Sequence, residues 1–263
     1  MSDPEHSRPP IDLEEASRAQ GRWRIEVVEE TASTNADVAE RFRSGEHEGL
    51  VLLAEHQTAG RGRLGREWVT PARSSLTVSF LLVPDLQVPT QRWPWLPLLT
   101  GVAAAAAVRR VTGVEVSLKW PNDLLSGNQK VGGILLERVE HSGSPAAVVG
   151  IGLNCSQTAD ELPVAEATSL WTVTGEQVDR SALLLALVEE LSASYDEWQA
   201  GGDLRTAYLA LCTTPGQDVR VAVPGGDVAG QAVDVDEAGR LVVRTSGGEE
   251  HLGAGDVVYV RPQ

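Results

Sequence analysis

The sequence predicts an α+β protein in two parts, a larger part over residues 21–213 and a small all-β part over residues 214–263. In the larger part, apolar runs of strand length alternate with helical patterns. After Pro215, short alternating runs (VRVAV, GQAVDVD, RLVVRT and DVVYV) are separated by turn sequences such as PGGD and DEAG. Hairpins at such close intervals indicate a small antiparallel barrel or sandwich of about 50 residues. A length of 263 residues is enough for one or two domains with a buried core.

The strands of the larger part follow from apolar runs bounded by polar or turn residues. Such runs predict strands over residues 23–30, 49–55, 76–83, 114–119, 130–139 and 146–154. Residues 121–129 (PNDLLSGNQ) have turn chemistry, and residues 56–75 show no apolar periodicity.

Three helices are predicted in the same part. Residues 181–198 carry apolar side chains at the spacing of an amphipathic helix, and residues 98–111 form an Ala-rich apolar run that favours a buried helix. A further helix over residues 35–43 follows three candidate N-caps, Thr31, Ser33 and Thr34.

The composition and the net charge of the chain argue against several classes of function and location. The 22 basic and 37 acidic residues give a formal net charge of −15, which repels phosphate backbones, so we expect no general nucleic-acid binding. The polar residues 1–20 predict a flexible tail without a signal peptide, and the longest uncharged run, residues 93–108, is too short and too rich in proline to span a membrane. Cys155 and Cys212 have neither metal nor disulfide spacing. These features predict a cytoplasmic protein without a membrane partner.

Positive charge is concentrated in residues 60–73, GRGRLGREWVTPAR. Four arginines and one glutamate give this stretch a local net charge of +3. Its three glycines, at positions 60, 62 and 65, let the backbone approach a ligand closely. Interleaved arginines predict a mobile loop that closes over a phosphate or a carboxylate with forked donors. Taken alone, the stretch favours an exposed basic loop without a ligand.

The same stretch matches the G-x-G-x-x-G pattern of dinucleotide-binding proteins. That pattern requires a helix to begin at the third glycine, where its N-terminus holds the pyrophosphate. Here Gly65 is followed by REWVTPARSS, in which Pro71 and the β-branched Val69 and Thr70 do not favour a helix. A P-loop is excluded because no Gly-Lys-Ser/Thr sequence follows. The dinucleotide interpretation is therefore disfavoured.

Lysine is nearly absent from the chain. Arginine supplies 20 of the 22 basic residues, and the two lysines, Lys119 and Lys130, flank one turn, KWPNDLLSGNQK. A compact ammonium contacts carboxylate or phosphate oxygens from several directions, which indicates a chemical requirement at these positions, although chance clustering gives the same pattern. Between them, Asn122 and Asp123 either form the turn or serve the site, where Asp123 would balance Lys119 or approach a magnesium ion held by phosphates.

Glycines recur on two later strands. Gly132 and Gly133 follow Lys130, and GIGLN (residues 150–154) places glycines at alternate strand positions. Such positions clear one face of a strand for a ligand, or else mark bulges and close packing. Asn154 then offers an amide with both a donor and an acceptor, as a purine base requires.

Together these motifs resemble those of the biotin protein ligases. The matching segments are STN (33–35), AEHQTAGRGRLGREW (54–68), KWPNDLL (119–125), KVGGILLE (130–137) and GIGLN (150–154). They occur in the family's order, and the resemblance runs over most of residues 22–260. It implies a catalytic domain of the class II aminoacyl-tRNA-synthetase-like type, with a mixed sheet and flanking helices, over residues 21–213. A small SH3-like β-barrel would follow over residues 214–263.

The resemblance also implies a two-step reaction. The biotin carboxylate attacks the α-phosphorus of ATP, giving biotinyl-5′-AMP and pyrophosphate. A lysine of a biotin carboxyl carrier domain, part of a biotin-dependent carboxylase, then attacks the activated carbonyl. ATP and biotin would be the substrates, with Mg²⁺ as cofactor. Because the adenylate is a reactive mixed anhydride, we expect residues 60–68 to be mobile without ligand and to become ordered over it.

Individual roles follow from the same resemblance. The catalytic residues would be Lys130, Arg61 and Lys119. Biotin would be bound by Ser33, Thr34, Asn35, Gln57, Arg61, Gly62, Arg63, Lys130 and Gly133. The nucleotide would be bound by Arg63, Arg66, Trp68, Lys119, Asn122, Asp123 and Asn154, with Mg²⁺ near Asp123. This assignment requires Arg61 and Lys130 to share one cavity.

Family members that double as transcriptional repressors carry an N-terminal DNA-binding domain, for which 20 polar residues leave no room. We therefore expect a monofunctional ligase that binds no operator DNA. The nearest alternative is a lipoate or octanoate transferase of the same fold, which the arginine-rich loop and the KWPND turn disfavour. A binding module that captures biotinyl-AMP without transferring it, and a nucleotide-dependent dehydrogenase, are further alternatives.

Overall fold

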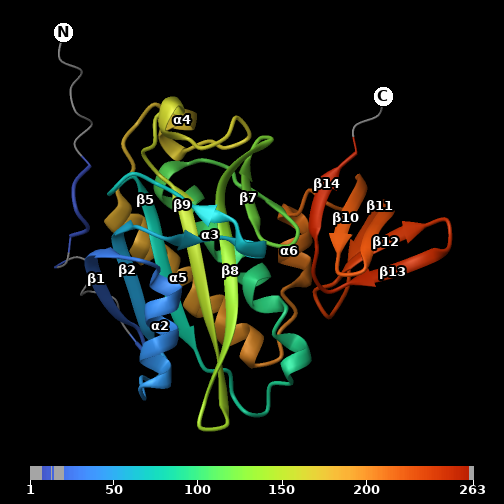
Figure 1. Ribbon diagram of the computed structural model, residues 1–263, viewed down its shortest axis with the longest axis horizontal. Coiled ribbons are helices and arrows are strands. Elements are labelled where there is room, and N and C mark those ends of the chain that lie inside the picture. The colour runs from blue at the N-terminus through green and yellow to red at the C-terminus, as the bar shows by residue number, and fades with distance from the viewer. Residues whose placement is uncertain (1–7, 13, 15–20, 261–263) are drawn as a thin grey trace.

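The larger part of the chain is built on a seven-stranded sheet (Figure 1). The computed structural model describes residues 8–12, 14 and 21–260. The strand order is β1-β2-β5-β9-β8-β7-β6, with β1 and β2 parallel and every other neighbouring pair antiparallel. The bounds are β1 Arg24–Thr31, β2 Leu50–Gln57, β5 Ser75–Leu82, β6 Ser117–Lys119, β7 Asp123–Ser126, β8 Gln129–His141 and β9 Ser144–Asn154. The sheet is thus mixed, as expected.

Helices cover both faces of this sheet. Helix α2 (Thr34–Arg43) lies on one face, where Val38 and Phe42 pack against alternate residues of β2, β5, β8 and β9. Helices α3 (Trp95–Thr112) and α5 (Arg180–Gln199) pack on each other and on the opposite face, which holds the larger apolar core. Two short helices, α4 (Leu170–Thr174) and α6 (Arg205–Leu211), complete this part. Continuous apolar runs in the central strands follow from burial on both faces.

The C-terminal part is a five-stranded antiparallel sheet. Its strands are β10 Asp218–Val223, β11 Gly226–Val235, β12 Leu241–Thr245, β13 Gly248–Leu252 and β14 Asp256–Tyr259. They are ordered β13-β12-β11-β10-β14, so a four-stranded meander is completed by a last strand that returns to the first, as in SH3-like folds. The sheet docks on α3 and on the segment before β7, because the Trp95 and Trp120 indoles donate to the carbonyls of Glu237 and Gly239 at 2.7 and 3.0 Å. The two parts therefore share a polar and aromatic interface.

Most of the predicted elements are present, with a few differences at their ends. Helix α3 begins three residues earlier than predicted, because Pro97 falls in its first turn, where a missing N–H costs little. The segment predicted as a turn at residues 121–129 contains strand β7, and β6 is shorter than predicted. Ser33 occupies the N-cap position of α2, but its side chain makes no capping bond.

Residues 8–12 pack on the domain, although the sequence predicts that they belong to a flexible tail. The Ile11 side chain is buried and its N–H donates to Glu55 Oε1 at 2.6 Å, while the Asp12 N–H donates to Ser181 Oγ at 2.9 Å. The Arg180 guanidinium also donates to the Pro9 carbonyl at 2.7 Å. This short segment is therefore packed on the domain. Residues 1–7, 13 and 15–20 of the predicted tail lie outside the described residues.

The two cysteines are predicted to differ sharply in reactivity. Cys155 is fully buried, and burial raises the pKa of its thiol to about 12, so the thiol stays protonated at pH 8. Cys212 is only partly buried at the end of α6. We expect a thiol reagent at pH 8 to modify Cys212 alone in the folded chain and both residues in urea. Equal labelling rates of Cys155→Ala and Cys212→Ala variants would contradict this expectation.

No helix in the described part of the chain is long and apolar enough to cross a membrane.

Candidate active site

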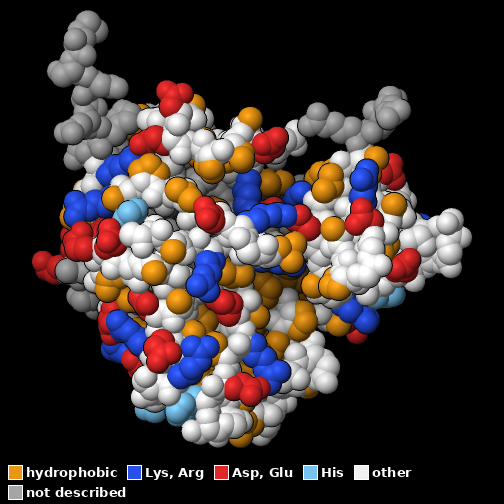
Figure 2. Space-filling model, in the orientation of Figure 1, with side chains coloured by type: hydrophobic (Ala, Val, Ile, Leu, Met, Phe, Trp, Pro, Cys, Tyr) orange, Lys and Arg blue, Asp and Glu red, His pale blue; other side chains and the backbone are white. Residues whose placement is uncertain are grey.

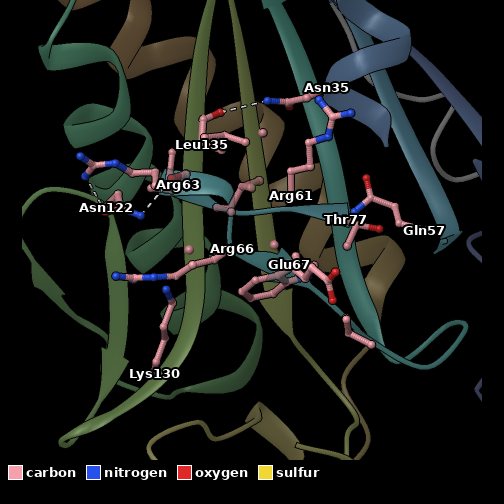
Figure 3. A pocket seen from close by; sticks show the side chains of 18 of the residues that line it. Asn35, Gln57, Arg61, Arg63, Arg66, Glu67, Thr77, Asn122, Lys130 and Leu135 are labelled. Carbon is pink, nitrogen blue, oxygen red and sulfur yellow. Dashed lines mark hydrogen bonds between the residues drawn. The ribbon is translucent and has the colours of Figure 1, made fainter. Parts of the chain in front are cut away.

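A cavity of about 360 Å³ opens where β8 and β9 face the start of α2, within the range of small-molecule sites (Figure 3). Its walls come from the N-terminal residues of α2, the end of β2, the middle of β5, the glycine-rich parts of β8 and β9, and residues 163–167. Residues 60–68, here called the flap, form its cover. Arg61 of the flap and Lys130 of β8 both line this cavity, as predicted.

The flap is a short two-stranded ribbon rather than the start of a helix. Strands β3 (Gly60–Arg61) and β4 (Glu67–Trp68) pair, with a 3₁₀ turn at Arg63–Gly65 between them. Leu64 and Gly65 have φ values of 57° and 74°, and the Leu64 side chain is 72% exposed. No helix follows Gly65, so the arrangement required for dinucleotide binding is absent from this segment.

Trp68 at the end of the flap lies on the glycine-rich face of the sheet. A Cβ at Gly152 would come within 2.5 Å of the indole ring, and one at Gly133 within 3.7 Å. These glycines therefore make room for the Trp68 ring as well as for a ligand. Gly132 has a different role, because a Cβ there would lie 2.7 Å from Leu153 Cδ2 and 2.8 Å from the Gly152 carbonyl.

The polar end of the cavity is built around the start of α2. Gln57 Oε1 accepts from the Thr34 N–H at 2.8 Å and from the Thr34 hydroxyl at 3.0 Å, and Ser33 is buried beside them. Asn35 Nδ2 donates to Glu137 Oε2 at 2.8 Å and to the Leu135 carbonyl at 3.3 Å. Asn35 thus lines the cavity, and both of its amide hydrogens are used in bonds to β8.

The other end of the cavity is rich in cations. Lys130 Nζ lies 2.6 Å from Asp123 Oδ1, and Arg63 Nη1 donates to Asn122 Oδ1 at 2.9 Å. Arg66 and Lys130 both line the cavity and extend toward the same side of it in Figure 3, whereas the Arg61 guanidinium points toward Asn35. On the outer surface, Lys and Arg side chains gather near the centre of the face in Figure 2, over the upper part of β8. A local reversal of charge in an acidic chain is thus present, as the sequence predicts.

The C-terminal sheet contributes to this charged end. Arg66 forms an ion pair with Asp256, which also lines the cavity, and Lys119 Nζ lies 4.8 Å from the centre of the Tyr259 ring. Burial lowers the pKa of Lys119, and the carboxylates of Asp123 and Asp256 oppose this effect. Burial likewise lowers the pKa of the Arg63 guanidinium. Lys119 and Asp123 are not among the lining residues, but both are partly exposed, and Asp123 contacts the lining residue Lys130 at this end of the cavity.

Asn154 lines the cavity with its amide already bonded. Its Nδ2 donates to the Thr168 carbonyl at 2.9 Å, and its Oδ1 accepts from Gln157 Nε2 at 3.1 Å. Asn122 is engaged similarly, because its Nδ2 donates to the Ile134 carbonyl at 3.1 Å while its Oδ1 holds Arg63. Both amides therefore fix the cavity wall. These bonds use one amide hydrogen and one oxygen lone pair of each side chain, so each amide keeps a donor and an acceptor for a ligand.

Comparison with known proteins identifies the family. Residues 26–154 match the model of the biotin/lipoate A/B protein ligase family, and residues 214–259 match the biotin protein ligase C-terminal domain. The chain is 41% identical, over an alignment of 272 positions, to a biotin–[acetyl-CoA-carboxylase] ligase of Mycobacterium tuberculosis, covering 99% of this chain and 100% of that protein. The chain belongs to the biotin protein ligase family.

Solved structures of biotin protein ligases agree with this assignment. The Aquifex aeolicus ligase in complex with biotin and ATP matches with a TM-score of 0.75 and 29% identity, covering 90% of this chain and 99% of that one. The Leishmania major ligase in complex with biotinyl-5-AMP matches with a TM-score of 0.57 and 26% identity, covering 88% and 98%. The ligase fold therefore extends over both parts of the chain.

Several lining residues of this biotin protein ligase were not predicted from the sequence. They are Thr77 and Val78 of β5, Leu135 of β8, Ile151 of β9, Glu166 of the segment after β9, and Asp256. Alternation of polar and apolar residues in β5 could have marked Thr77, because one face of that strand must turn toward the site. Val78 and Ile151 point to the opposite face, into the apolar core, so alternation could not have marked them. No local signal marks Glu166 or Asp256, because tertiary packing alone brings them to the cavity.

The flap of the ligase is expected to be protected by its substrates. It offers trypsin three arginines, Arg61, Arg63 and Arg66, around the exposed Leu64. Because closure over an adenylate would order the flap, biotin plus ATP should slow cleavage there about tenfold. Cleavage at the exposed Arg43, at the end of α2, should not change. Equal cleavage of the flap with and without substrates would contradict a closing role.

Proposed function

We propose that this protein attaches biotin to a lysine of a carrier protein by way of biotinyl-5′-AMP, using ATP and releasing pyrophosphate and then AMP. One observation carries the proposal: in a chain of the ligase family, a single cavity joins a polar end at Thr34 and Gln57 to a cationic end at Arg63, Arg66 and Lys130. A neutral bicyclic ring with a carboxylate tail fits the first end and points its tail toward the second.

At the polar end, the proposed contacts of biotin are those of its ring. Ser33, Thr34 and Gln57 offer hydroxyl and amide groups to a urea, and Gly133 leaves room beside Lys130, because a Cβ there would lie 3.2 Å from Lys130 Nζ. Asn35 holds these residues in place through β8 rather than by donating to the ring, since both of its amide hydrogens are used.

At the cationic end, the proposed task is to bring two anions together. The carboxylate and the triphosphate repel each other, so fixed positive groups at Arg63 and Lys130 supply the main stabilisation of the first transition state. Arg61, whose guanidinium points toward Asn35, is proposed to join them when the flap closes over the substrates. Gly62 contributes its backbone, which approaches the site without a side chain. Arg66 and Lys119 are proposed to hold the phosphates, with Trp68 packing over the intermediate and Asn122, Asp123 and Asn154 holding the nucleotide side.

Mg²⁺ is proposed as a ligand of ATP rather than of a preformed protein site. Within the described ranges, no group of three or more His, Cys, Asp or Glu side chains is placed to hold a metal. Mg²⁺ commonly combines one or two carboxylates with substrate phosphates and water. Asp123 fits that role, because only its Oδ1 is paired with Lys130.

The second step requires a neutral lysine amine in a site from which water is excluded. We propose that the acceptor is the biotin carboxyl carrier domain of a biotin-dependent carboxylase, by analogy with the ligase of M. tuberculosis. We also propose that the reaction takes place in the cytoplasm.

The test is to incubate the chain with ATP, Mg²⁺ and a purified carrier domain, with biotin or lipoate. We expect pyrophosphate release that depends on biotin, followed by transfer of biotin to the carrier lysine. Release that depends on lipoate would favour the acyltransferase alternative. Formation of biotinyl-AMP without labelling of the carrier would indicate a binding module instead.

Nucleic acid is proposed not to be a partner. A formal net charge of −15 disfavours approach to a phosphate backbone. We expect no shift of biotin-operator DNA at 50 mM salt in the presence of biotin and ATP. Sequence-specific binding that weakens with salt would contradict this proposal.

A further inference from the structure

Four oxygen atoms lie in a row beneath the polar end of the cavity. Asn35 Oδ1, Ser79 Oγ, Thr34 Oγ1 and Gln57 Oε1 are separated in turn by 2.6, 2.7 and 3.0 Å. Asn35, Thr34 and Gln57 line the cavity, whereas Ser79 of β5 is fully buried and is not a lining residue. Ser79 therefore touches the ligand-binding side chains from behind.

Both ends of this row are fixed as acceptors. Asn35 uses its two amide hydrogens on Glu137 and on the Leu135 carbonyl, so its Oδ1 faces Ser79. Gln57 Oε1 receives the backbone N–H of Thr34, which can only donate, so the amide nitrogen of Gln57 points away, toward Gly60. Gly150 keeps the Asn35 amide in place, because a Cβ at this position would overlap Asn35 Oδ1.

The row has fewer hydrogens than contacts. Ser79 and Thr34 each carry one hydroxyl hydrogen, and these two hydrogens must serve three oxygen–oxygen contacts. When Ser79 donates to Asn35 and Thr34 donates to Gln57, a lone pair of Thr34 Oγ1 remains without a hydrogen. A ligand N–H that enters from the cavity would donate to that lone pair.

We propose that Ser79 is a positioning residue that makes this end of the cavity an acceptor of ligand N–H groups, and so selects a cyclic urea over an acyl group that lacks N–H. The inference rests on the proposed function, because it concerns the ring end of the same substrate. Ser79 acts through Thr34 and Asn35. Without its hydroxyl, Asn35 Oδ1 loses its partner and the Thr34 hydroxyl is no longer held in one orientation.

The first test is Ser79→Ala, followed by pyrophosphate release. We expect the KM for biotin to rise about tenfold, as for loss of one buried hydrogen-bond partner, with kcat and the KM for ATP within twofold of wild type. The KM for desthiobiotin, which keeps both urea N–H groups, should rise by the same factor. Lipoate has no N–H, so kcat/KM for any residual lipoate-dependent pyrophosphate release should not change. The ratio of kcat/KM for biotin to kcat/KM for lipoate should therefore fall about tenfold.

Two further variants separate positioning from simple destabilisation. Thr100→Val removes another fully buried hydroxyl, which donates to the Leu96 carbonyl within α3, and it should leave the KM for biotin unchanged. In a Thr34→Val background, Ser79→Ala should add less than twofold, because the acceptor that Ser79 orients is already gone.

The outcomes distinguish this inference from the function on which it rests. A wild-type chain that releases no biotin-dependent pyrophosphate would refute the proposed function. An active wild type with an unchanged KM for biotin in a folded Ser79→Ala variant would overturn the inference alone. Equal effects of Ser79→Ala with and without Thr34 would overturn it as well.

Discussion

Replacing Lys130 with alanine is expected to slow biotin-dependent pyrophosphate release by roughly 10²–10³-fold, as for removal of one fixed group that stabilises developing charge. Two effects act in the same direction. The variant loses an ammonium group that lines the cavity, and it leaves the Asp123 carboxylate, 2.6 Å from that ammonium, without its partner beside the incoming phosphates. The measurement is single-turnover formation of biotinyl-AMP.

A second variant separates these two effects. In Lys130→Ala/Asp123→Ala the unpaired carboxylate is gone, so part of the lost rate should return, while the contribution of the ammonium itself stays lost. Arg109→Ala is the matched control, because Arg109 is an exposed cation paired with Glu115 and should leave the rate unchanged. A rate for Lys130→Ala within threefold of wild type would contradict the proposed catalytic role.

Replacing Arg180 with methionine is expected to lower the free energy of unfolding by about 3–5 kcal/mol, as for breaking a buried ion pair from one side. Arg180 Nη2 lies 2.7 Å from Glu55 Oε2, and the two side chains are 5% and 2% exposed. The guanidinium also donates to the carbonyls of Ser75 and Pro9. Without it, Glu55 is left as an uncompensated charge in the interior. Urea unfolding followed by tryptophan fluorescence measures the change.

The matched control for this prediction is an exposed ion pair. Arg110→Met removes a partly exposed guanidinium that pairs with Glu189 and Glu190, and it should cost less than about 1 kcal/mol. The double variant Glu55→Leu/Arg180→Met should be more stable than Arg180→Met, because it removes the unpaired charge. If Arg180→Met and Arg110→Met have similar effects, the pair does not contribute as proposed.

Long apolar segments made much of the fold predictable. Strands β8 and β9 and helix α5 lie within a few residues of their predicted ranges, because burial dictates their composition over ten or more residues. Strand β7 and helix α6 were not predicted, because four and seven residues carry too little periodicity to outweigh turn chemistry or a mixed pattern. Their structure depends on neighbours that a local pattern does not contain.

The site was predictable to a similar extent. Motifs correctly brought Arg61, Gln57 and Lys130 to one cavity. Which polar residues contact the ligand and which ones position their neighbours was not predictable, because these roles depend on hydrogen-bond partners from other strands. The amide of Asn35, for example, is held by β8 and by Ser79 of β5. Asp256 reaches the cavity from the C-terminal sheet, more than 180 residues from the flap in sequence. Side-chain chemistry is local information, whereas hydrogen-bond partners are set by tertiary structure.

The glycines of β9 restrict which substitutions homologues of this chain can accept. Gly150 and Gly152 each face a side chain from a distant segment, Asn35 and Trp68 respectively, that occupies the volume a Cβ would need. A change at either glycine is therefore tolerated only when its opposite residue becomes smaller in the same lineage. Aligned homologues should accordingly show position 150 varying together with position 35, and position 152 with position 68, as two separate covarying pairs.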